Sequence, residues 1–130
     1  MIARMTRTVL TMGTALALLG PAGMATAEDD GVERHGPCSG AARWELDAER
    51  EGAKLEVEFD VDRAPTGSVW RVRMWQDGSL IANVTRTAGG EHEFDVQRLT
   101  ANTAGTDAFA ARAVDQASGQ VCRGSVTYPA

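Results

Sequence analysis

The chain has few of the residues that catalysis or metal binding requires. It contains two cysteines and two histidines. His35 and His92 lie far apart in the sequence, and no serine occurs in a Gly-x-Ser-x-Gly motif. Two oxidised cysteines would leave no thiolate nucleophile. We therefore expect no enzyme, no cofactor and no metal ion. Glycosidase-like carboxylate pairs stay open as an alternative, because an acidic chain offers many candidate pairs.

Basic side chains are also scarce. The sequence has 13 Lys and Arg residues against 18 Asp and Glu residues, which gives a formal net charge of −5, and Lys54 is its only lysine. A protein that binds nucleic acid needs a basic surface to neutralise phosphates. The charge balance therefore predicts no nucleic-acid partner.

Long hydrophobic runs are absent as well. One short apolar run, residues 9–19, follows Arg4 and Arg7 and precedes the small residues at 25–27. It is shorter than the roughly 20 residues needed to span a bilayer. The order of charge, apolar run and small residues is typical of a cleavable signal peptide. We predict a signal peptide at 1–27 and a secreted, extracellular protein without a membrane attachment after cleavage; a membrane anchor is the less favoured alternative.

The two cysteines, Cys38 and Cys122, lie near the two ends of the chain that remains after cleavage. An even number of cysteines in an exported chain favours a disulfide over free thiols. We predict a bond between them that closes one domain over residues 37–130. Residues 28–36 are polar and are predicted to form a flexible leader.

Alternation with a period of two dominates the sequence after the leader. In the clearest example Leu55, Val57 and Phe59 alternate with acidic residues, as in a strand with one buried face. The same pattern places Leu80 in the core, and His92 at its rim or inside it. The predicted strands are 42–49, 54–62, 69–76, 79–87, 91–97, 107–115 and 120–128. Asp77-Gly78 is typical of a tight hairpin turn.

About seven strands separated by turn signals predict an all-β fold, an antiparallel sandwich of two sheets. In an immunoglobulin-like arrangement the first, second and fifth strands form one sheet and the other four form the second. The first and last strands then lie near each other, so that the cysteines can meet. Strand 107–115 is apolar on both sides and is expected to be central and covered. A small closed barrel is the alternative.

Several short motifs carry a resemblance to a known group of proteins. They are the Gly36-Pro37-Cys38-Ser39 segment, Trp44-x-Leu46, Gly67-x-x-Trp70, the Asp77-Gly78 hairpin, Gly105-Thr106-Asp107 and Gly119-Gln120-Val121-Cys122. Together these residues resemble small secreted actinobacterial proteins of unassigned function. The resemblance implies an immunoglobulin/fibronectin type III-like β-sandwich and an extracellular location, but no chemistry.

The outward positions of the predicted strands separate by charge, since residues two apart share a face. One outer surface collects acidic residues, namely Glu45, Asp47, Glu49, Glu56, Glu58, Asp60, Glu91, Glu93 and Asp95. Carboxylates along flat strands are not expected to converge on a calcium ion, so we interpret this surface as solvated. The other surface collects Arg71, Arg73, Arg112 and Arg123, together with Trp75 and Ile81.

Arginine and tryptophan often anchor protein interfaces. The sequence therefore predicts a non-catalytic binding module, a monomer, that contacts an extracellular protein or a cell-wall glycan through the arginine surface. In the non-functional alternative, these arginines are ordinary solvated charges. A further alternative is a secreted enzyme inhibitor or small-ligand carrier that acts through loops 62–68 or 100–106.

Overall fold

The structure is a computed structural model that describes residues 31–130. The predicted signal peptide, residues 1–27, lies outside the described residues. Within the described range all regular structure is β, and no helix is long and apolar enough to cross a membrane. The strands are β1 (Gly31–Pro37), β2 (Arg43–Glu51), β3 (Lys54–Asp62), β4 (Val69–Gln76), β5 (Ser79–Thr87), β6 (Glu93–Ala101), β7 (Asp107–Asp115) and β8 (Val121–Tyr128).

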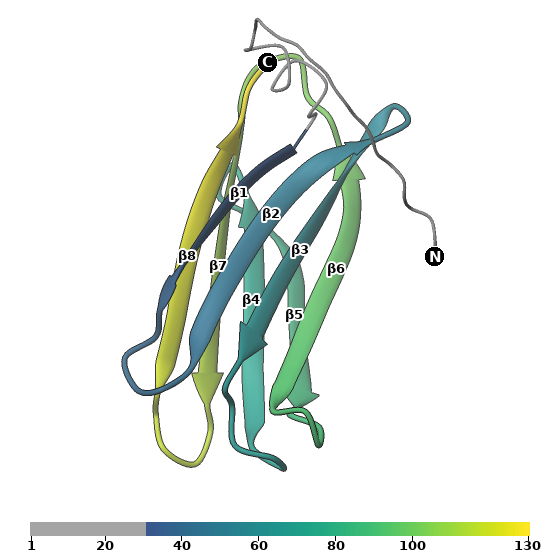
Figure 1. Cartoon of the computed structure of the whole chain (residues 1–130). Helices are drawn as coiled ribbons and strands as arrows, with labels where there is room; N and C mark the ends of the chain where they lie inside the picture. The colour runs from purple at the N-terminus through teal and green to yellow at the C-terminus, as the bar shows by residue number, and fades with distance from the viewer. Residues whose placement is uncertain (1–30) are drawn as a thin grey trace, which may run out of the picture. The chain divides into compact units, whose positions relative to one another are not determined.

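The strands form two antiparallel four-stranded sheets that face each other (Figure 1). Their orders are β1-β2-β3-β6, here called sheet A, and β5-β4-β7-β8, here called sheet B. The predicted sorting of seven strands into two sheets is confirmed. Because the sheets stay separate, the closed-barrel alternative is wrong.

Strand β1 corrects the predicted leader. Residues 31–36 are not a flexible leader but belong to Gly31–Pro37, which pairs antiparallel with β2 along its whole length. The sequence offers little sign of this strand, because only Val32 supplies an apolar side chain among polar residues and glycines. Backbone pairing and the edge position do not need an apolar pattern. Residues 28–30 lie outside the described residues.

The core lies between the two sheets. Its largest fully buried side chains include Trp70, Phe59, Phe109, Leu46 and Leu55. They occupy the inward positions of strands that the alternation predicted, and they come from both sheets. The Trp70 ring lies 5.5 Å from the ring of Phe94 and joins the sheets near one end. The period-two pattern therefore fixed most of this core.

In β5, Leu80 and Ile81 lie on the faces opposite to those that the sequence predicts. The pairing between β4 and β5 shifts between Met74 and Trp75, which is the mark of a β-bulge. Leu80, predicted in the core, pairs with Trp75 and is 51% exposed. Ile81, predicted on the arginine surface, instead packs against the core. A one-residue shift moves side chains to the opposite face of a sheet, and strict alternation cannot anticipate it.

The turn before β6 also differs from the prediction. His92 is exposed and has a φ of 65°, and its backbone N–H donates to the carbonyl of Gly89. The turn thus extends through His92, and the strand begins at Glu93. The prediction of His92 at the rim or in the core is therefore wrong.

Strand β7 is central in sheet B, as predicted, since it pairs with both β4 and β8. Its outer face is not covered, however, because Ala108 is exposed and Ala110, Arg112 and Val114 are half-buried. The apolar residues on both sides reflect small alanines on an open face rather than a second covering layer.

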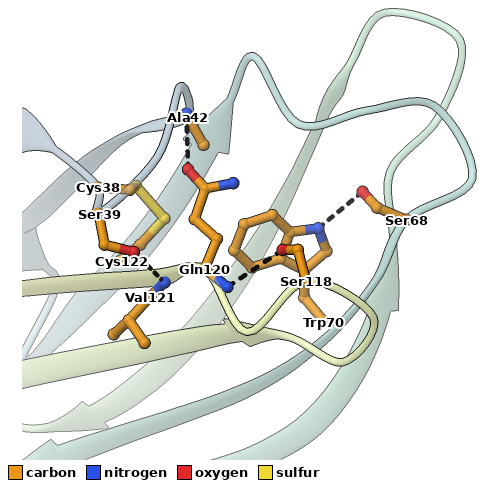
Figure 2. The surroundings of a disulfide bond; sticks show 9 residues. All are labelled: Cys38, Ser39, Ala42, Ser68, Trp70, Ser118, Gln120, Val121 and Cys122. Carbon is orange, nitrogen blue, oxygen red and sulfur yellow. Dashed lines mark hydrogen bonds between the residues drawn. A yellow bond between two sulfur atoms is a disulfide. The ribbon is translucent and has the colours of Figure 1, made fainter.

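The predicted disulfide joins Cys38, in the β1–β2 loop, to Cys122 on β8 (Figure 2). Hydrogen bonds reinforce the same junction: Ser39 N–H donates to the Val121 carbonyl at 2.8 Å, and Val121 N–H donates to the Ser39 hydroxyl at 2.9 Å. The Ala42 N–H donates to Gln120 Oε1 at 2.8 Å. The first loop of the described chain is thus fixed to its last strand.

Candidate functional site

A row of three arginines crosses the outer side of sheet B. Arg73 on β4 pairs with Arg112 on β7, and Arg112 pairs with Arg123 on β8. Strand neighbours lie about 4.8 Å apart, so the three Cα atoms form a line perpendicular to the strands. Arg73 and Arg112 are half-buried and Arg123 is exposed. The three predicted site residues therefore lie together.

The remaining side chains around this row are neutral or basic. Arg71 lies two residues before Arg73 and donates to Asn83 Oδ1 at 3.4 Å. The next row contains half-buried Trp75, which pairs with Leu80 on one side and Ala110 on the other. We call this surface the arginine face: Arg71, Arg73, Trp75, Leu80, Arg112, Val114, Val121 and Arg123.

The arginine face has no carboxylate of its own. No outward position on the four strands of sheet B is acidic. At the β4–β5 turn, Asp77 Oδ1 accepts the Ala108 N–H at 2.9 Å. Within residues 31–130, the side chains of Arg73, Arg112 and Arg123 form no hydrogen bond or ion pair. Like charges directly opposite each other destabilise a sheet, so this row lowers stability unless an anion compensates it.

The outer side of sheet A has the opposite charge. Glu45, Asp60 and Asp95 are paired neighbours on β2, β3 and β6 and form one row across the sheet. A second row contains Asp47 and Glu58, which pair with each other. We call this surface the acidic face: Glu33, Glu45, Asp47, Glu49, Glu56, Glu58, Asp60, Asp62, Glu93 and Asp95. The predicted charge separation between the two outer surfaces is therefore present, although Glu91 lies in a turn outside the sheet.

Crowding on the acidic face shifts the ionisation of its carboxyls. Burial, followed by the charges of Glu58 and Asp95, raises the pKa of Asp60 to about 7. Burial and the neighbouring carboxylates raise the pKa of Asp47 to about 6. A hydrogen bond with Glu33, burial and further carboxylates raise the pKa of Glu45 to about 7. The charged acidic face thus repels itself near neutral pH.

The carboxylates also converge more than the sequence suggests. In each of two triads, Glu33–Glu45–Asp47 and Glu58–Asp60–Asp95, one carboxylate oxygen per residue lies within 4.8 Å of the others. The expectation that carboxylates on flat strands do not converge is wrong for these triads. Pairing across neighbouring strands brings them together. With one oxygen from each residue, a triad supplies three of the six to eight oxygens of a calcium shell.

A groove of about 450 Å³ opens beside β8 at the edge of the arginine face. Arg34, Trp44, Ala110, Arg123, Gly124 and Ser125 line it. Arg34 and Trp44 come from sheet A, so the groove extends the arginine face around the edge of the sandwich. Arg34 was not among the predicted site residues, because the polar segment 28–36 gave no sign of a strand.

Hydrogen bonds hold both loops that were predicted as alternative binding elements, 62–68 and 100–106. Ser68 Oγ donates to the Pro65 carbonyl at 2.6 Å and accepts from Trp70 Nε1 at 2.8 Å. In the second loop, Thr103 Oγ1 donates at 2.8 Å to the carboxylate of Asp107, which is fully buried. These bonds fix the two loops onto the strand ends.

Comparison of the chain with protein-family models, with curated proteins and with solved structures finds no match. The geometry of the two faces therefore supports the function proposed below.

Proposed function

We propose that the chain is a secreted, non-catalytic binding module with an immunoglobulin/fibronectin type III-like β-sandwich. Its arginine face contacts an acidic extracellular partner, either a protein or a cell-wall glycan. The observation that carries this proposal is the row Arg73–Arg112–Arg123, which has no counter-charge within residues 31–130.

The chemistry of the arginine face supports an acidic partner. Guanidinium groups bind carboxylates and phosphates through charge-assisted hydrogen bonds. Trp75, Val114 and Val121 add apolar area beside them, which a partner can bury. Charged and aromatic groups in this combination are typical of interface anchors.

The extracellular location rests on two features. The sequence begins with a segment typical of a signal peptide. The disulfide between Cys38 and Cys122 is a bond that persists in oxidising compartments. Both favour function outside the cell.

The proposal is tested with the chain from residue 28 onward and an immobilised acidic polysaccharide, polygalacturonate, with dextran as the neutral reference. We expect salt-sensitive binding to the acidic polymer, which Arg73→Ala/Trp75→Ala weakens tenfold or more, as expected for anchor residues. Arg123→Gln, at an exposed position, should weaken binding without lowering the thermal unfolding temperature. Lys54→Ala, an exposed cation on sheet A, is the matched control and should bind as wild type does.

Equal binding by the wild type, the double variant and Arg123→Gln would contradict the role of the arginine face. Equal retention on dextran and polygalacturonate would contradict an acidic partner.

A further inference from the structure

The two outer faces of the sandwich carry charges of opposite sign. The arginine face has no carboxylate, and the guanidinium groups of Arg73, Arg112 and Arg123 form no hydrogen bond or ion pair within residues 31–130. The basic residues of the acidic face are Arg43 and Lys54, near its two ends, and His35, which pairs with Glu45. Each face is therefore complementary in charge to the opposite side of another copy of the same chain.

The spacing of the charges matches as well as their sign. The row Arg73–Arg112–Arg123 crosses three neighbouring strands, and the row Glu45–Asp60–Asp95 crosses three neighbouring strands. Both rows have the spacing of hydrogen-bonded strands, about 4.8 Å. Three guanidinium groups can thus stand opposite three carboxylates in register when one sheet is stacked on another.

On the basis of the function proposed above for the arginine face, namely binding, we propose that its partner is a second copy of this chain. The arginine face of one copy docks on the acidic face of the next. The two contacting faces differ, so the contact is heterologous and leaves one arginine face and one acidic face free at the ends. Repetition produces a head-to-tail stack rather than a closed dimer.

The size of the faces sets the strength of this contact. Four strands of about eight residues make a face of roughly 500 Å², so one contact buries roughly 1,000 Å² in total, within the range of weak, transient complexes. The chain is therefore a monomer in dilute solution, as the sequence analysis expects, and associates where it is concentrated. The chain from residue 28 onward has 11 basic and 18 acidic residues, and its net charge of −7 also opposes association between distant copies.

The energetics of the isolated face favour docking. Asp60 lies between Glu45 and Asp95 in its row, and burial, followed by the charges of nearby carboxylates, raises its pKa in the single chain. A row of arginines placed 4 to 5 Å away, roughly, would supply the missing opposite charge. The same contact would relieve the repulsion within the arginine row.

Sedimentation velocity of the chain from residue 28 onward tests the proposal. At about 10 mM salt the Debye length is about 30 Å, and at 1 M it is about 3 Å. We expect the weight-average mass to rise with protein concentration at low salt and to return to that of the monomer at high salt. Two variants with near-isosteric neutral rows, Arg73→Gln/Arg112→Gln/Arg123→Gln and Glu45→Gln/Asp60→Asn/Asp95→Asn, should each remain monomeric.

Mixing the two row variants gives the decisive result. One retains only the acidic row and the other only the arginine row, so together they should form a 1:1 complex that does not grow further. Glu91→Gln, which neutralises an exposed carboxylate in a turn outside both sheets, should associate as the wild type does. A monomeric wild type at millimolar concentration and low salt, or association that survives both row variants, would overturn the proposal.

The same proteins separate this proposal from the proposed function. A monomeric wild type that still binds polygalacturonate through Arg73 and Trp75 would remove the self-association alone. Loss of both properties would remove the arginine face as a binding surface.

Discussion

At the scale of single residues, Trp44 shows how the two sheets are joined at their open edge. Its ring lies 6.5 Å from the ring of Phe59. A Cβ added to Gly36 on β1 would meet the indole at 3.1 Å, and one added to Gly124 on β8 would meet its Cε3 at 2.6 Å. Both strands therefore approach the indole more closely than a side chain would permit.

We expect Gly124→Ala to destabilise the fold by about 1 to 3 kcal/mol, because the new methyl group overlaps a ring that is held on its other side. Urea unfolding measures the loss. Gly105→Ala is the matched control, since a Cβ there meets nothing within 4 Å. A loss at Gly124 no larger than that at Gly105 would show that the indole moves freely.

At the scale of elements, the pairing of strands in sheet A brings carboxylates close together on its outer face. The acidic face combines neighbouring carboxylates with partial burial, and the pKa of Asp60 rises to about 7 for that reason. An unfolded aspartate titrates near pH 4, roughly. Between these values the folded state binds more protons, so this group makes stability fall as pH rises from about 4 to about 7.

We expect Asp60→Asn to raise stability at pH 8 by roughly 1 kcal/mol, less than the full shift implies, because water screens a half-exposed carboxylate. At pH 4 the variant and the wild type should unfold alike. Thermal unfolding across this pH range measures both values. Glu91→Gln, an exposed turn position, is the control, and an Asp60→Asn variant that is less stable at pH 8 would contradict the repulsion.

Strand β5 shows where element-level prediction fails. Leu80 and Ile81 have the same hydrophobic character, and only the bulge opposite them decides which one joins the core. The bulge has no sequence signal in this hairpin beyond Asp77-Gly78. Leu80 thus adds an apolar side chain to the arginine face in place of Ile81.

At the scale of the whole molecule, the disulfide closes the domain. Its cysteines are separated by 84 residues in sequence. Cross-linking a loop of this size constrains the unfolded chain by about 4 kcal/mol, on a chain-entropy account.

We expect Cys38→Ala/Cys122→Ala to lose about 2 to 5 kcal/mol of stability, and reduction of the wild type to have a similar effect. Urea unfolding with and without reductant measures both. Ser39→Ala, which removes one hydrogen bond at the same junction, should cost about 1 kcal/mol. A double variant as stable as Ser39→Ala would show that hydrogen bonds alone hold this junction.

The sequence by itself determined seven of the eight strands, their sorting into two sheets, the disulfide and the opposite charges of the outer surfaces. Alternation has a period of two whatever the partner strand, so it predicts which face a residue such as Arg73 or Asp60 occupies. Only the tertiary structure decided that β1 is a strand, that Leu80 replaces Ile81, and that Arg73, Arg112 and Arg123 form one row opposite in sign to Glu45, Asp60 and Asp95. Register joins residues that are distant in sequence, and no local pattern encodes it.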